Sequence, residues 1–392
     1  MEKIININDK RPDGSRFDVA VVGGGIIGLS VGWKLLQRGF GVAVFERDSV
    51  GSGATQAATG MLAASAEVEP GEDDLLPLTL ASQQLWHGFA KELEQASGQA
   101  VDYRREGTMV VALSRDEVDR LRFRHDLQTR LGLDTVWLSG SAAREREPGL
   151  RPNVSGAIFC AQDHQVDARK VAAALAAALR KAGGQIFEDT RVMSLERSGG
   201  RVTGIATEAQ TYAARTVVLA AGAWSPDLVQ GLELPVRPLK GQSLALRMDM
   251  KTPALTHVVW TEQIHMAPKG DGRLIVGATV EERGFDTANT AGGLFALLEA
   301  VRRVLPSVEE LPIDEIWTGF RPTSLDDAPI LGESGIDGLV IATGHHRNGI
   351  LLAPVTARAI SGLIADGRMD GPESTFTFQR FRHNADRLTQ GI

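Results

Sequence analysis

The chain of 392 residues contains almost no cysteine, since Cys160 is the only one. A single thiol can form no internal disulfide and cannot build a thiolate metal site, which excludes a disulfide-stapled module and a zinc-thiolate domain. This scarcity fits a reducing compartment, and we expect a cytoplasmic protein. The histidines show no metal-ligand spacing, so no metal site is predicted.

Long apolar runs and blocks of like charge are also absent. The longest stretch without charge, Ser49–Ala66, is rich in Gly, Ala, Ser and Thr and is typical of a loop, so no membrane span is predicted. The 42 basic and 49 acidic residues are spread along the chain, which argues against a nucleic-acid partner. Residues 1–16 lack the apolar core of a signal peptide and are interpreted as a polar extension.

Glycine, by contrast, is abundant, with 43 residues. The glycines cluster instead of repeating at every third position, so they indicate tight turns and close approach of the backbone to a ligand. The length favours two domains, and the 43% of hydrophobic residues are ample for buried cores.

The first glycine cluster follows a predicted strand, Phe17–Val22. Residues Gly23–Gly28 fit the pattern G-x-G-x-x-G, a helix is predicted over Leu29–Gln37, and a second strand, Gly41–Phe45, leads to Glu46. This βαβ unit predicts a dinucleotide site in which the helix N-terminus faces the pyrophosphate and the acid accepts the ribose hydroxyls. The carboxylate disfavours NADP, whereas NAD and FAD both stay open at this point.

Small residues explain how the backbone would approach such a ligand. Gly23 allows the tight turn, Gly25 lets the backbone approach the pyrophosphate, and Gly28 allows close contact between helix and strand. The next segment, 51–62, has little reason to fold on itself, so we expect it to lie along an extended cofactor; a flexible surface loop is the alternative.

Several motifs carry a resemblance to a known family. The βαβ unit followed by GATQAATGML (53–62) resembles the FAD-dependent D-amino acid oxidase superfamily. Near the other end, GFRP (319–322), PILG (329–332) and GHHRNGILLAP (344–354) are similar to the glycine oxidases of the ThiO type, and the likeness extends from Phe17 to about Ile364. The resemblance implies non-covalent FAD, a homotetramer or other homo-oligomer, and a role in thiamine biosynthesis.

The resemblance also implies an activity, the oxidative deamination of glycine, sarcosine and small D-amino acids such as D-alanine. Hydride would pass from the substrate Cα to flavin N5, and oxygen would be reduced to hydrogen peroxide. The amine would react in its neutral form, so the C–H step needs no general base. A dehydrogenase that passes electrons to a quinone or a partner protein is the alternative, and a non-catalytic FAD protein is a further one.

Site residues follow from the same motifs. Arg321 matches the arginine that pairs with the substrate carboxylate, a role suited to a permanently charged fork, with a domain-interface salt bridge as the alternative. Arg347 matches a second arginine near flavin and substrate, with an ordinary loop charge as the alternative. The positions matching FAD contacts, besides the three glycines, are Ile26, Ile27, Glu46, Arg47, Ala54, Thr55, Thr59, Gly60, Met61 and Val192, and, in the loop around the flavin, His345, His346, Arg347, Asn348, Gly349, Ile350 and Leu351.

Two positions depart from the family pattern. His265 stands where tyrosine is common and Val280 where methionine is common, and both positions line the family's substrate cavity. The preference among glycine, sarcosine and D-amino acids therefore stays open. His265 could shape the pocket or act on a proton.

We expect a mixed α/β fold in which a Rossmann-like FAD-binding domain is interleaved with a substrate domain. The FAD-binding domain is assigned to residues 17–74, 151–231 and 323–366, and the substrate-binding domain to 75–150 and 232–322. The second domain has β-branched and alternating runs that predict a mixed or antiparallel sheet with flanking helices. Residues 367–392 are assigned to a C-terminal tail.

Overall fold

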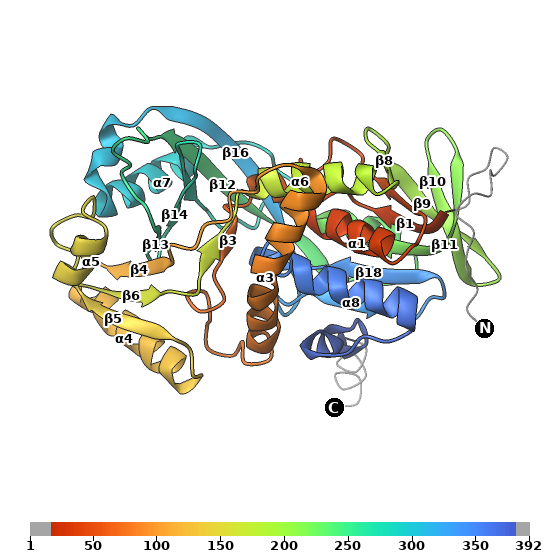
Figure 1. Cartoon of the computed structure of the whole chain (residues 1–392), viewed down its shortest axis with the longest axis horizontal. Helices are drawn as coiled ribbons and strands as arrows, with labels where there is room; N and C mark the ends of the chain where they lie inside the picture. The colour runs from red at the N-terminus through yellow and green to blue at the C-terminus, as the bar shows by residue number, and fades with distance from the viewer. Residues whose placement is uncertain (1–16, 382–392) are drawn as a thin grey trace.

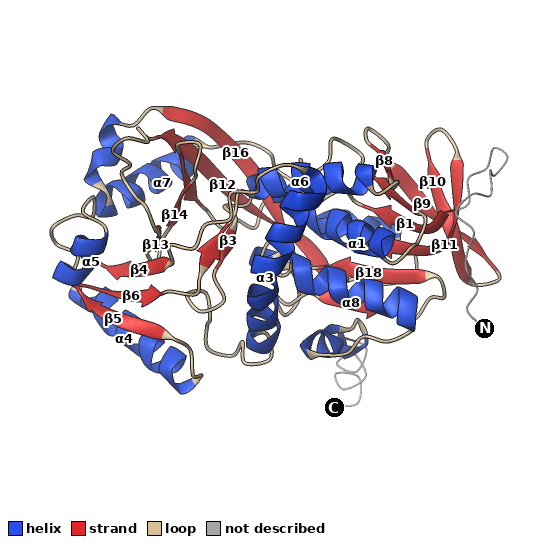
Figure 2. Ribbon diagram, in the orientation of Figure 1, coloured by secondary structure: helices blue, strands red, loops and turns tan. Residues whose placement is uncertain are grey.

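The computed structural model describes residues 17–381, which form two β-sheets along the long axis of the molecule, each with helices packed on it (Figure 1). Figure 2 shows that helices and strands are mixed in both halves, so the expected α/β class is confirmed. The predicted polar extension, 1–16, and the end of the predicted C-terminal tail, 382–392, lie outside the described residues.

The first sheet is built around the predicted βαβ unit. Strand β1 (Phe17–Val22) pairs in parallel with β2 (Val42–Phe45) and β11 (Thr211–Leu219), and helix α1 (Ile26–Gln37) connects the first two. The sheet continues through β18 (Leu339–Thr343), which is parallel to β11, so an early strand, β1, and a late strand, β18, lie on either side of β11. The remaining strands are β8 (Gln185–Phe187), β9 (Val192–Ser198), β10 (Arg201–Thr207) and β17 (Ile330–Glu333).

Strand β1 is buried on both faces because alternate side chains of a strand point to opposite sides of a sheet. Val19 and Val21 belong to the cluster beneath the helices, whereas Ala20 and Val22 belong to a second cluster with strands β9 and β10. The helices on the first face are α1, α3 (Leu76–Ser97), α6 (Ala168–Lys181) and α8 (Ala353–Asp366).

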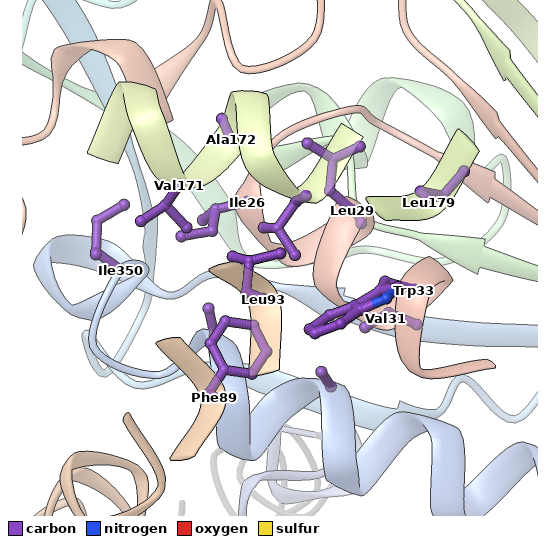
Figure 3. Close-up of a cluster of buried hydrophobic side chains, with 14 of the residues drawn as sticks. Ile26, Leu29, Val31, Trp33, Phe89, Leu93, Val171, Ala172, Leu179 and Ile350 are labelled. Atoms are coloured by element: carbon purple, nitrogen blue, oxygen red, sulfur yellow. The ribbon is translucent and has the colours of Figure 1, made fainter. Parts of the chain in front are cut away.

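Helix α3 corrects one domain assignment, because residues 75–150 were expected in the substrate domain. The Phe89 ring packs edge-on against Trp33 of α1, with centroids 5.6 Å apart (Figure 3). Trp86 Nε1 donates a hydrogen bond of 2.8 Å to the carbonyl of Leu351. The helical periodicity indicates an apolar face but not which sheet it covers, so the packing partner could not be predicted.

The second sheet is mixed, as predicted, and is antiparallel except for one parallel pair, β13 with β4. Its strands, in spatial order, are β16 (Ile313–Ser324), β12 (Val236–Arg247), β15 (Arg273–Gly277), β14 (His265–Pro268), β13 (Val258–Trp260), β4 (Thr108–Ala112), β6 (Gly156–Cys160) and β5 (Thr135–Ser139). Helix α7 (Ala291–Val304) packs on β12 and β15, and α4 (Arg115–Arg130) and α5 (Gly140–Arg146) pack at the other end.

Strand β6 is the second correction. Residues 151–231 were assigned to the FAD-binding domain, yet Gly156–Cys160 pairs with both β4 and β5 in the second sheet. A short apolar strand fits either sheet, and only its partners decide the choice. The expected boundary between residues 322 and 323 likewise falls inside β16.

Shorter elements complete the fold. The run 49–66, expected to be a loop, contains the short helix α2 (Ala54–Ala57) and strand β3 (Met61–Leu62), which pairs with β7 (His164–Gln165). The four 3₁₀ helices are η1 (Gly222–Leu228), η2 (Pro306–Glu310), η3 (His346–Asn348) and η4 (Pro372–Phe376). In the expected tail, Phe376 and Phe378 are buried. Among residues 17–381, the helices are too short or too polar to cross a bilayer.

Candidate functional site

The turn between β1 and α1 requires glycine at two positions. Gly23 has φ +109°, and a Cβ there would lie 2.3 Å from the carbonyl oxygen of Ala220 on the neighbouring strand. A Cβ at Gly28 would lie 2.0 Å from the carbonyl oxygen of Gly23. The sequence predicts both requirements, because a dinucleotide turn needs tight curvature and close helix–strand contact.

Glu46 lies at the end of β2, as predicted, beside this turn. Its Oε2 accepts a hydrogen bond of 2.7 Å from the Gly24 amide, and its Oε1 accepts one of 3.1 Å from the Asp48 amide. The carboxylate is therefore fixed next to the N-terminus of α1. An acid held there can accept hydrogen bonds from a ribose, the arrangement typical of dinucleotide sites.

A cavity of about 720 Å³ begins at this turn and extends to the second sheet. Its walls come from the ends of β2 and β11, the loop 52–61, the start of β9, strands β12, β14 and β16, and the turn after β18. Both sheets thus contribute to one site. Its volume lies within the usual range for ligand pockets.

Most of the residues predicted from the sequence line this cavity. They are Gly23, Gly25, Ile26, Ile27, Glu46, Arg47, Ala54, Thr55, Thr59, Gly60, Met61, Val192, His265, Val280, Arg321, His345, His346, Arg347, Gly349 and Ile350. Three predicted residues do not. Gly28 packs against the Gly23 carbonyl, Asn348 lines a small neighbouring pocket, and the Leu351 carbonyl accepts hydrogen bonds from α3.

Arg321 extends from β16 across the facing strand. A Cβ at Gly241 would lie 2.6 Å from its Nη1, so the absence of a side chain there makes room for the guanidinium. Nη1 donates a hydrogen bond of 3.2 Å to the carbonyl of Thr279. Burial lowers the pKa of Arg321, and the negative charge of Glu67 opposes this shift. Within residues 17–381 no carboxylate lies within salt-bridge distance of this arginine, so its fork is free to receive one.

Arg347 is placed differently, because carboxylates of the chain already pair with it. Its Nε donates to Glu67 Oε2 at 3.1 Å, and its Nη2 donates to both carboxylate oxygens of Glu72 at 2.6 and 2.7 Å. It lines the cavity near the turn after β18, as expected for the second arginine. Its side chain, however, holds the loop 67–72 in place and has less capacity left for a ligand carboxylate.

His265 on β14 is a buried, neutral imidazole. Its Nε2 lies 3.1 Å from Thr59 Oγ1, and its ring lies 5.4 Å from the Trp260 ring. Burial, followed by the charges of Arg321 and Lys269, lowers the pKa of His265 to about 3. At neutral pH this side chain therefore carries no charge, and it cannot act as an acid because no imidazolium proton is present.

Sequence reasoning missed many of the other lining residues, and Glu67, Trp260 and Trp224 are three of them. Glu67 is the first charged residue after the uncharged run 49–66, and that position was the available signal. Trp260 donates from Nε1 to Met61 Sδ at 3.0 Å, and Trp224 stacks under the Arg47 guanidinium at 3.6 Å. A single aromatic residue in a strand is typical of a core, so nothing in the sequence marked Trp260. The turn 221–225, which contains Trp224, resembles a second approach to the cofactor, but Trp224 was not predicted as a site residue.

A βαβ dinucleotide turn that shares its cavity with an arginine-bearing second sheet defines a dinucleotide-dependent oxidoreductase. The model of the DAO family, described as FAD dependent oxidoreductase, matches residues 18–363, and the chain belongs to this family. FAD is therefore its cofactor. Among the described residues, no group of three His, Cys, Asp or Glu side chains is placed to hold a metal ion.

Named relatives of the chain share this family. It is 37% identical over 355 residues to a glycine oxidase of Geobacillus kaustophilus, covering 89% of this chain and 93% of the relative. It is 38% identical over 370 residues to the bifunctional protein ThiO/ThiG of Synechocystis, covering 93% of this chain but only 54% of that longer protein. The crystal structure of the Geobacillus enzyme superposes with a TM-score of 0.87 at 35% identity, covering 92% of this chain and 98% of that one.

The described residues fit FAD. The glycine turn leaves space where side chains would collide with backbone, and the carboxylate of Glu46 is fixed beside it. From the glycine turn and Glu46, which would hold the ADP half, the cavity continues to Arg321 and the turn after β18. The cavity therefore has room between the two sheets for the rest of the cofactor beyond its ADP half.

Proposed function

We propose that the chain is a glycine oxidase, an FAD-dependent enzyme that oxidatively deaminates glycine and small amines or D-amino acids such as sarcosine and D-alanine. The observation that carries this proposal is Arg321, a half-buried guanidinium that has no carboxylate partner among the described residues and lines the cavity of the dinucleotide turn. The likeness to glycine oxidases supports the substrate class.

The chain's own residues divide the work within this proposal. Arg321 receives the substrate carboxylate and orients the substrate, since a planar guanidinium fixes direction as well as charge. Gly23, Gly25 and Glu46 hold the ADP half of the cofactor, and the turn 345–350 lies at its other end. Bound FAD supplies the oxidant, which takes a hydride from the substrate Cα. The imine that results hydrolyses to an oxo acid and ammonia or an amine.

The finer assignments are part of the same proposal. Oxygen is the electron acceptor and hydrogen peroxide the second product, the protein is a cytoplasmic homotetramer, and the oxidation serves thiamine biosynthesis. The low cysteine content supports a reducing compartment. Light scattering of the purified protein would measure the subunit number.

An anaerobic reduction assay tests the function directly. We expect glycine, sarcosine and D-alanine to bleach the visible absorbance of the bound flavin, and acetate, which has no amine to oxidise, to leave it unchanged. Admission of oxygen should restore the absorbance with release of hydrogen peroxide. Reoxidation only by a quinone would indicate a dehydrogenase. No bleaching by any amine would indicate a non-catalytic FAD protein.

His265 is expected to shape the pocket without handling a proton, because its pKa of about 3 keeps it neutral. Replacing His265 with asparagine should lower kcat/KM for glycine by about tenfold or less and should leave its pH profile unchanged across the neutral range. His265→Phe, which keeps the ring and loses the contact with Thr59, is the matched control for shape. Disappearance of one limb of the pH profile in the asparagine variant would contradict this expectation.

A further inference from the structure

Glu67 is a buried acid in the cavity whose role no motif explains. It lies in the loop that connects β3 to α3, and only 9% of its surface is exposed. It lines the same cavity as Arg321 and His265. A buried carboxylate is costly unless it is paired or hydrogen-bonded, so its partners indicate its task.

Its partners account for one carboxylate oxygen. Oε2 accepts the hydrogen bond from Arg347 Nε, while the Glu67 carbonyl accepts one of 3.2 Å from Arg347 Nη2. No described residue donates a hydrogen bond to Oε1. Arg347 also donates hydrogen bonds to both carboxylate oxygens of Glu72, and it therefore holds Glu67 through Oε2 alone. The Oε1 of Glu67 is available to accept a hydrogen bond from a ligand N–H.

The charges in the cavity are arranged for a zwitterion. Arg321 offers a cation without a carboxylate partner, and the negative charge of Glu67 is the charge that acts upon it. An α-amino acid presents a carboxylate, which suits the guanidinium of Arg321, and an ammonium group, which suits the open oxygen of Glu67. A ligand with only a carboxylate would pair with Arg321 and would offer no donor to Glu67 Oε1.

We propose that Glu67 binds the substrate amino group and accepts a proton from its ammonium form, so that the amine is neutral when it is oxidised. This inference rests on the proposed function. In the transfer, an N–H bond breaks and an O–H bond forms on the carboxylate, while the electron pair of the N–H bond remains on nitrogen. Nothing is oxidised or reduced in this step.

The proton affinity of Glu67 suits such a transfer. The pKa of Glu67 is raised to about 7, mainly by burial; Arg347 opposes this shift, and the negative charges of Asp163 and Glu72 contribute to it. Arg321 is the other charged group that faces it across the cavity. Below this pKa the free enzyme carries protonated Glu67, which can accept no proton. We therefore expect kcat/KM for glycine to rise as the pH passes upward through about 7.

The test compares Glu67→Gln with Glu72→Gln in the FAD-loaded enzyme. Both variants remove one carboxylate from Arg347, but Glu72 does not line the main cavity. Glu67→Gln should lower kcat/KM for glycine about 100-fold and abolish its rise with pH. The affinity for acetate, measured from the change in the flavin spectrum, should change by less than about threefold, because acetate has no amino group that could contact Glu67. Glu72→Gln should change glycine turnover and acetate binding by the same factor and should keep the rise with pH, moved to a lower pH because the charge of Glu72 helps to raise the pKa of Glu67.

Two results would overturn the proposal. One is an equal loss of glycine turnover and acetate binding in Glu67→Gln, and the other is persistence of the rise with pH in that variant. Flavin content and the thermal unfolding midpoint, measured on both variants, identify any loss of fold. Failure of glycine to bleach the flavin of the unmutated protein would instead refute the proposed function, so the two failures are distinguishable.

Discussion

Replacing Arg321 with alanine is expected to raise KM for glycine by about 100- to 1000-fold while FAD stays bound. A bidentate pair between guanidinium and carboxylate contributes several times the energy of a neutral hydrogen bond, and alanine offers neither charge nor donor. Steady-state kinetics give the shift in KM, and the ratio of flavin to protein absorbance gives the cofactor content. Because Arg321 is half-buried and has no carboxylate partner among the described residues, its removal should leave the unfolding temperature unchanged or higher.

Arg321→Lys is the matched control, since it keeps the charge and loses the planar fork. We expect it to recover part of the affinity, because an ammonium group attracts the carboxylate without fixing its orientation. A kinetic profile of Arg321→Ala equal to that of the unmutated protein would refute the carboxylate role. Loss of FAD in the alanine variant would point instead to a contact with the cofactor.

Replacing Gly28 with alanine is expected to abolish FAD binding and to destabilise the fold by about 3 kcal/mol. The added Cβ would lie 2.0 Å from the carbonyl oxygen of Gly23, so the turn and the start of α1 would have to move apart. Flavin content after purification and the free energy of unfolding in urea measure the two effects.

Gly32→Ala on the same helix is the control for this variant. Its Cβ would meet the flexible end of Leu179 at 3.1 Å, and alanine is the better helix former. We expect this variant to retain FAD and to unfold with a free energy within about 1 kcal/mol of the unmutated protein. Equal loss of FAD in both variants would contradict this prediction, because it would show that an added methyl group anywhere on α1 is harmful and that the turn is not the cause.

The sequence predicted the local parts of this molecule well. The strand Phe17–Val22 and the glycine turn were correct because a buried parallel strand and a dinucleotide turn each have a strict residue pattern. A local pattern also explains the start of α6, where the Asp167 side chain accepts hydrogen bonds from the amides of Arg169 and Lys170.

Predictions failed where the outcome depends on a distant partner. The apolar face of α3 could have covered either sheet, and it was assigned to the wrong one because Trp33, its partner, is remote in sequence. Glu67 was overlooked for the same reason, since its importance comes from Arg347, which lies 280 positions away. No local pattern encodes such contacts.

The separation of Glu67 from Arg347 also sets an order of events during synthesis. The βαβ unit is made before the rest of the cavity and can form its glycine turn, but the wall at 342–350 is made only after every other segment that lines the cavity. Strand β18, which pairs with β11 beside β1, is equally late. The complete cavity therefore cannot form before residue 350 has been made, and a chain stalled before residue 339 would have neither this strand nor the turn that follows it.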